Sequence, residues 1–145
     1  MKRKALIAFF VILLILMLTG CTMVPPGESL EDMAEQTVYE YWRAIINRQY
    51  ELAKWHCITG GVWYNKTDEW EEYINTNSEG EASVVIYGPT FYEETEVIGD
   101  DIIVYTRITT DITAFPGSSY HEGDFFEYEI ELIKQNFPPG DCKLK

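Results

Sequence analysis

The sequence predicts an α+β domain in which N-terminal helices pack on a curved antiparallel sheet of about four strands. Two observations carry this prediction. Apolar residues recur at helical spacing from residue 30 to about residue 75, whereas after Gly80 they alternate with a period of two. Turn signals, and not helices, separate the later segments, which is typical of antiparallel strands. Helices followed by a run of strands are the element order of α+β domains.

The first predicted helix covers about residues 30–46. Ser29 precedes Asp32 by three residues, which is the spacing of a capping box at the start of a helix. Apolar residues then follow at helical spacing, and they are Leu30, Met33, Ala34, Val38, Tyr41, Trp42 and Ile45. A turn at residues 47–49 should end this helix.

Two shorter helices are expected next. One covers about residues 49–57 and stops at Gly60-Gly61. Its inward-facing residues are expected to be Tyr50, Leu52, Ala53 and Trp55. The other covers about residues 67–75, with Asn65 as its cap. Its apolar positions are Trp70, Tyr73 and Ile74.

Four strands are expected after Gly80. The first covers residues 82–87 and ends at Gly88-Pro89, and the second covers residues 91–98, before a hairpin turn at Gly99-Asp100. The third covers residues 102–113 and the fourth covers residues 125–135. One face of the third strand is apolar through Ile102, Val104, Ile108 and Ile112. The fourth alternates most regularly: Phe126, Tyr128, Ile130 and Leu132 face one way, and Glu127, Glu129 and Glu131 face the other.

The N-terminal segment has the features of an export signal. Lys2, Arg3 and Lys4 precede an apolar run of 14 residues, which is shorter than the roughly 20 that a membrane-spanning helix needs. The run ends in Leu18-Thr19-Gly20-Cys21, which resembles the lipobox of bacterial lipoproteins. That resemblance implies cleavage before Cys21 and attachment of lipid to its sulfur. The prediction is therefore a signal peptide at residues 1–20, a lipidated tether at 21–28, one domain at 29–137 and a C-terminal tail at 138–145.

Composition limits the partners of the exported chain. Cleavage would leave 125 of the 145 residues and remove three positive charges, so the net charge would pass from −13 to −16. Nucleic acid should not bind such an acidic domain, because its phosphates would be repelled. The expected location is the outer face of the cell membrane, or the outer membrane if the host has one. The expected partners are the membrane, through the lipid anchor, and an envelope protein or a small ligand.

The order of elements resembles the nuclear transport factor 2-like superfamily, also called SnoaL-like. Residues 38–57, VYEYWRAIINRQYELAKWHC, carry the resemblance: an aromatic-rich helix, a polar turn near Asn47, then Tyr50 and Ala53 in the next helix. The long strands after Gly80 fit the cone-shaped sheet of this superfamily. A cystatin-like domain, with one helix on a sheet, is the nearest alternative. The resemblance implies a pocket between helices and sheet, which serves catalysis in some members and only binding in others.

Three functions follow as hypotheses. The first is a non-enzymatic module that binds a ligand or a partner, with Trp63, Tyr64 and Tyr92 as exposed aromatic residues around the mouth of the cone. The second is a small isomerase or dehydratase, with Asp111 as base and Tyr105 as oxyanion donor. However, Asp111 has the same parity along its strand as Arg107, so both should lie on one face. This favours an exposed position for Asp111 over a position in a pocket. The third is a cation binder that uses the acidic strands.

Cys57 and Cys142 remain after Cys21 is assigned to the lipid. An exported compartment permits disulfides, so these two cysteines are expected either to pair or to remain as one buried thiol and one thiol on the tail. The bridge is the preferred alternative, since it would hold the C-terminal tail. No pattern predicts a metal or a cofactor: His56 and His121 have no zinc-site spacing to the cysteines, and the acidic clusters lack the spacing of a calcium loop.

Overall fold

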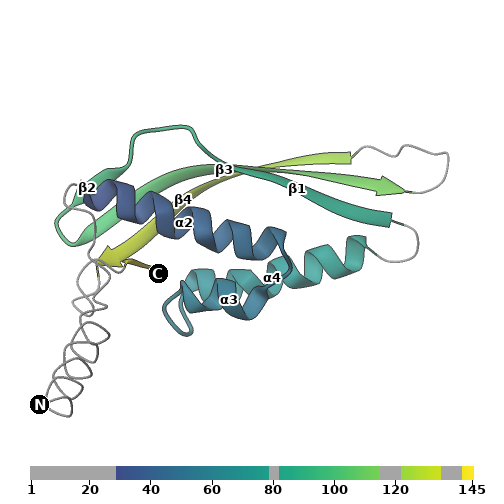
Figure 1. Ribbon diagram of the computed structural model, residues 1–145, viewed down its shortest axis with the longest axis horizontal. Helices are drawn as coiled ribbons and strands as arrows, with labels where there is room; N and C mark the ends of the chain where they lie inside the picture. Colours follow the sequence, from purple (N-terminus) through teal and green to yellow (C-terminus); the bar gives the residue numbers. More distant parts are fainter. Residues whose placement is uncertain (1–28, 79–81, 115–121, 135–141) are drawn as a thin grey trace, which may run out of the picture.

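Three helices lie against one face of a strongly curved antiparallel sheet in the computed structural model (Figure 1). The structure describes residues 29–78, 82–114, 122–134 and 142–145. The expected signal peptide at 1–20 and tether at 21–28, Cys21 included, lie outside these residues. The elements in chain order are α2 (Leu30–Ile46), α3 (Tyr50–Trp55), α4 (Val62–Asn77), β1 (Ala82–Phe91), β2 (Glu96–Ile98), β3 (Asp101–Ala114), β4 (Glu122–Lys134) and β5 (Cys142–Leu144).

Helix α2 confirms the prediction at both ends. The Asp32 backbone N–H donates to the Ser29 hydroxyl at 3.1 Å, and the Ser29 N–H donates to the Asp32 carboxylate at 3.0 Å, which completes a capping box. The buried residues of the helix include Val38, Trp42 and Ile45, none of which is exposed to solvent. The expected apolar face is therefore the face that meets the sheet.

The two shorter helices differ from the prediction. Helix α3 has only six residues and buries only Ala53 among them, so Leu52 and Trp55 remain 47% and 66% exposed. Helix α4 begins at Val62, five residues earlier than expected, and Asn65 lies inside it as an exposed residue and not as its cap. The early start has a tertiary cause, because the backbone N–H of Trp63 donates to the carbonyl of Lys145 at 3.0 Å.

The strands pair in the order β1-β3-β4-β5, and the short β2 pairs with β3. The first strand does not end at Gly88-Pro89 but continues to Phe91 through a register shift between Tyr87 and Thr90. Gly88 makes this irregularity possible: its φ is +121°, and a Cβ there would lie 2.9 Å from the Arg107 carbonyl oxygen. The second strand is shorter than expected, whereas the third and fourth match closely and alternate inward and outward as predicted.

The expected C-terminal tail is in part a strand. β5 pairs with Leu132–Lys134 at the end of β4, and Leu144 also forms a parallel bridge with Cys57. The Leu144 backbone accepts from Ile58 at 2.8 Å and donates to His56 at 3.1 Å. The last residues of the chain thus connect the sheet to the loop between α3 and α4, and the domain extends to Lys145.

The core lies between the concave face of the sheet and the three helices. Ile102, Val104, Ile130 and Leu132 from the sheet are fully buried there together with Trp42 of α2. The buried hydrophobic residues of the described chain, from Ala34 to Leu144, form one cluster, so the described part of the domain contains a core of its own. None of the helices in the described ranges has the length and apolar character needed to span a bilayer.

Candidate binding site

Asp111 and Tyr105 lie on the outer face of the sheet. On β3 the inward positions, among them Val104, Thr106 and Thr110, are buried, and the two candidates have the opposite parity and are partly exposed. The Tyr105 hydroxyl donates to the Glu96 carboxylate at 3.2 Å, on an exposed site. This pair therefore does not place a base and an oxyanion donor inside the concave interior, as an isomerase-like site would require.

The three aromatic residues expected around the mouth do not form one surface. Trp63 is only 6% exposed, because the early start of α4 turns it into the core, where its ring contacts Tyr41 and Tyr128. Tyr64 packs partly buried beneath the ammonium of Lys54, which lies 5.1 Å from its ring centre. Tyr92 contacts Tyr105 and the guanidinium of Arg107, both of which belong to the outward positions of β3.

The disulfide expected between Cys57 and Cys142 is not formed. The structure holds both cysteines as buried thiols, 6% and 4% exposed. The Cys57 thiol donates to the Ala53 carbonyl oxygen at 3.5 Å. Burial raises the pKa of Cys57 to about 12, while a hydrogen bond with Thr67 and the charge of Lys143 act in the opposite direction. A thiol that is protonated at neutral pH is a poor nucleophile, so Cys57 and the neighbouring His56 do not form an activated pair.

Thiol titration checks this arrangement. We expect residues 22–145, purified without reductant, to react slowly with a disulfide reagent at pH 8 while folded and to yield two thiols per chain in denaturant. The physical reason is that the reagent needs an accessible thiolate, and both cysteines are buried. A sample treated with reductant beforehand serves as the control. Absence of reactive thiols in the denatured, unreduced chain would contradict the structure.

No group of three histidine, cysteine, aspartate or glutamate side chains stands in metal-binding geometry within the described residues. His56 is 8% exposed and contacts the Trp55 ring, and His121 lies outside the described ranges. Most described acidic side chains of the sheet lie at outward positions of β2, β3 and β4, whereas Asp124 has the inward parity of β4 and accepts a hydrogen bond from Tyr73.

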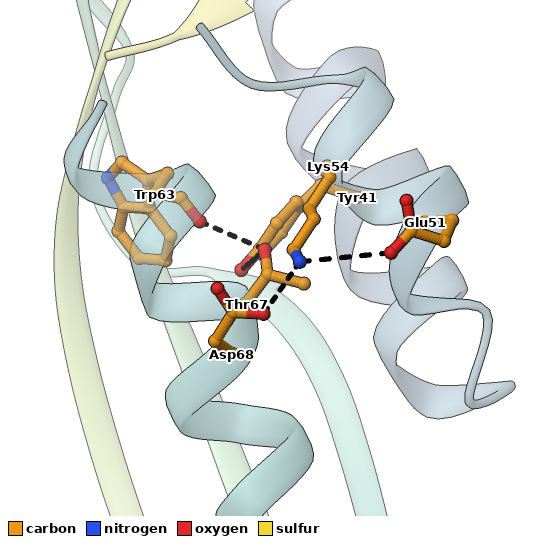
Figure 2. Close-up of polar contacts among 6 residues, drawn as sticks. All are labelled: Tyr41, Glu51, Lys54, Trp63, Thr67 and Asp68. Carbon is orange, nitrogen blue, oxygen red and sulfur yellow. Dashed lines mark hydrogen bonds and ion pairs between the residues drawn. The ribbon is translucent and has the colours of Figure 1, made fainter. Parts of the chain in front are cut away.

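Polar contacts among the helices fix the position of α4 (Figure 2). The Tyr41 and Thr67 hydroxyls lie 3.2 Å apart in the core, and the Thr67 hydroxyl donates to the Trp63 carbonyl oxygen at 2.9 Å. Nearer the surface, the Lys54 ammonium lies 2.6 Å from the Asp68 carboxylate, and this ion pair joins α3 to α4. These contacts connect α2, α3 and α4. They therefore hold α4, with the residues that face the sheet, in a defined position.

A continuous set of aromatic rings runs from α2 across α4 to β4. Trp42 is at its centre and has edge contacts with Trp63 and Trp70 at centroid distances of 6.1 and 5.3 Å, and it stacks on Tyr128 at 5.6 Å. Trp70 in turn contacts Phe126 at 5.3 Å. The inner end of the set is buried with Trp42, whereas Phe126 and Tyr128 are only partly buried.

The outer end of this aromatic set forms a pocket between α4 and β4. Its volume is about 210 Å³, and its lining residues are Lys66, Glu69, Trp70, Tyr73, Phe126 and Tyr128. The Lys66 ammonium and the Glu69 carboxylate form an exposed ion pair of 2.6 Å at the rim. Hollows of 460 and 530 Å³ also lie along α2, but mainly polar and charged side chains line them. The pocket between α4 and β4 is therefore the candidate binding site.

Two tyrosines shape the pocket. The Tyr73 hydroxyl donates to Asp124 at 3.0 Å and lies 3.2 Å from the Thr110 hydroxyl, so it joins α4 to β3 and β4. Burial raises the pKa of Tyr128 to about 12, while the nearby indole of Trp70 acts in the opposite direction. Tyr128 is thus neutral at physiological pH, and the pocket floor presents uncharged aromatic surface.

Comparison with protein-family models, curated proteins and solved structures found no match to this chain. The candidate site therefore rests on its own geometry.

The four aromatic residues of the pocket, Trp70, Tyr73, Phe126 and Tyr128, are expected from the sequence on apolar faces and not in a site. Trp70 and Tyr73 share a face of α4 because they are three residues apart, and Phe126 and Tyr128 share a face of β4 because they are two apart. That spacing correctly indicated inward side chains. It carried no signal that the last two rings would lie near an uncovered edge of the sheet and so remain partly exposed.

Proposed function

We propose that this chain is a lipid-anchored, extracytoplasmic module that binds a partner protein through the aromatic pocket between α4 and β4, without catalysis. The basic start, the short apolar run and the lipobox-like Leu18-Thr19-Gly20-Cys21 support anchoring at the outer face of a membrane. The order of helices and the curved sheet support a relationship to the nuclear transport factor 2-like superfamily.

The size of the pocket is the observation that favours a protein partner. Sites for whole small molecules usually have volumes of about 300–1,000 Å³, whereas this pocket has about 210 Å³. A cavity of about 150 Å³ is known to hold one benzene ring. The pocket is therefore matched to one aromatic or branched aliphatic side chain, which a partner would insert as an anchor in the way that buried aromatic residues serve protein interfaces.

The enzymatic alternative lacks a corresponding arrangement. An isomerase or dehydratase of this fold needs its base inside the apolar cone. Asp111 and Tyr105 lie on the opposite face of the sheet from the pocket lining of β4. The pocket itself contains one carboxylate, Glu69, which is exposed and already paired with Lys66.

Site-specific photo-crosslinking in the native host tests the proposal. Glu69, at the rim and with a side chain 63% exposed, is replaced by p-benzoylphenylalanine, and a second strain carries the same probe at the exposed Glu94. We expect irradiation to join a protein to the chain from position 69 and not from position 94. Equal crosslinking from both positions, or none from position 69, would refute the pocket as the contact site.

A further inference from the structure

Among the described residues, strand β4 has an open edge along most of its length. On the side away from β3, β5 pairs only with Leu132–Lys134, and within the described ranges no other strand pairs there. The Glu131 carbonyl points to this edge, since it accepts from the Lys145 N–H at 2.9 Å. The N–H and C=O groups of successive residues point to alternate edges of a strand, and the pairing of β3 with β4 has no register shift that would interrupt this alternation. The N–H and C=O groups of Phe125, Glu127 and Glu129 therefore also point to the open edge.

The two faces beside this edge differ in chemistry. On the inner face, the edge runs beside Phe126 and Tyr128 and therefore beside the pocket. On the outer face, Glu127, Glu129 and Glu131 are exposed in a row. Glu127 is paired with Arg107 at 2.8 Å, and Glu131 lies 3.5 Å from the Lys145 ammonium. Glu129, between them, forms no ion pair within the described residues, so its charge is available to a neighbour.

We propose that the open edge of β4 binds an extended segment of the partner, in which basic residues alternate with aromatic or aliphatic residues. This inference rests on the proposed function and specifies the chemistry of its partner. An added strand continues the pleat of the sheet, so one set of its alternate side chains lies over the pocket and the other beside the glutamate row. Opposite charges on neighbouring strands are stabilising, which selects lysine or arginine for the outer set.

A second copy of this chain is a poorer occupant of the same edge. Pairing two β4 edges would bring the glutamate row of each copy beside that of the other, and like charges on neighbouring strands are destabilising. The net charge of the chain, −13, adds repulsion between copies at longer range. Charge complementarity therefore points to a cationic partner and away from self-association.

The first arm of the test uses a labelled synthetic peptide, Lys-Phe-Lys-Val-Lys-Phe-Lys, and residues 22–145 in a fluorescence anisotropy titration. A peptide of the same composition, with its lysines in one block, is the control for charge alone. Two further peptides carry N-methyl groups on one or the other alternate set of amides. We expect the alternating peptide to bind and the block peptide to bind at least about tenfold more weakly. Only one of the two alternate sets of amides would face the β4 edge. We therefore expect only one of the two methylated peptides to lose affinity, by a similar factor.

The second arm changes the protein. Glu129→Lys should weaken binding of the alternating peptide by about three- to tenfold, because it places like charge beside the lysines. Glu94→Lys is the matched control, since this exposed residue lies between β1 and β2, which pair with the other edge of β3. Both variants change the net charge equally, so only a local contact distinguishes them.

The outcomes separate this inference from the proposed function. Equal binding of the alternating and block peptides, insensitivity to both methylated sets, or equal effects of the two charge reversals would overturn strand addition, as would absence of peptide binding. If the photo-probe at position 69 still captures a protein in that case, the pocket function survives and only the edge is wrong. Loss of the crosslink refutes the function itself.

Discussion

Replacing Trp42 with alanine should lower the free energy of unfolding by about 3–5 kcal/mol. Trp42 has no solvent-exposed surface and contacts rings from α2, α4 and β4, so its removal leaves a cavity where three elements meet. A domain of this size is stable by about 5–15 kcal/mol in total, so the loss is a large part of its stability. Urea unfolding of residues 22–145, followed by circular dichroism, measures the difference.

Trp55→Ala provides the matched control. It removes the same side chain from a position that is 66% exposed, where the ring contacts the Lys143 ammonium at 4.2 Å from the ring centre. A cation–π contact at an exposed site contributes about 0.5–1 kcal/mol, and the loss should not exceed this. Equal destabilisation by the two alanine variants would show that α2 does not pack on the sheet through Trp42.

Trp42→Phe gives a graded comparison if the alanine variant does not fold. The Trp42 indole N–H has no acceptor within the described residues, so phenylalanine removes an unsatisfied donor while keeping one ring. Loss of the smaller volume should cost about 1–2 kcal/mol, partly offset by removal of that buried donor. A loss as large as the roughly 3–5 kcal/mol expected for alanine would contradict the absence of an acceptor for the indole N–H.

Cys21→Ser should abolish incorporation of labelled palmitate and leave the signal peptide uncleaved. The lipid would be attached to sulfur because a thiolate is a strong nucleophile, and a serine hydroxyl does not replace it. Two acyl chains anchor a protein stably, whereas one gives only marginal binding. The processed parent chain should therefore sediment with membranes. Gel mobility of the immunoprecipitated chain reports cleavage, and radiolabel in the same band reports lipid.

Cys57→Ala is the control for Cys21→Ser. It also removes one cysteine, but from inside the folded domain, where the thiol is buried. Labelling should persist in this variant and disappear only in Cys21→Ser. Palmitate that still enters the serine variant would show that the Leu18-Thr19-Gly20-Cys21 segment is not a lipobox.

Local patterns were sufficient to predict the class of the fold and its regular parts. The capping box at Ser29 and Asp32, the inward face of α2 and the alternation of β4 depend on residues a few positions apart, so their physical causes are visible in the sequence. The export signal at residues 1–20 is likewise a local pattern, and it stays a prediction that the Cys21→Ser experiment decides.

The tertiary structure decided what depends on distant partners. Helix α4 begins at Val62 because its second residue, Trp63, donates to the backbone of Lys145, more than 80 positions away. The same contact brings the C-terminal residues into the domain as β5. Trp63 then becomes a core residue and not an exposed anchor, while Phe126 and Tyr128 remain partly open because β5 covers only the last residues of β4. Spacing indicates which face a side chain occupies, but only the packing of separate elements determines whether that face is covered.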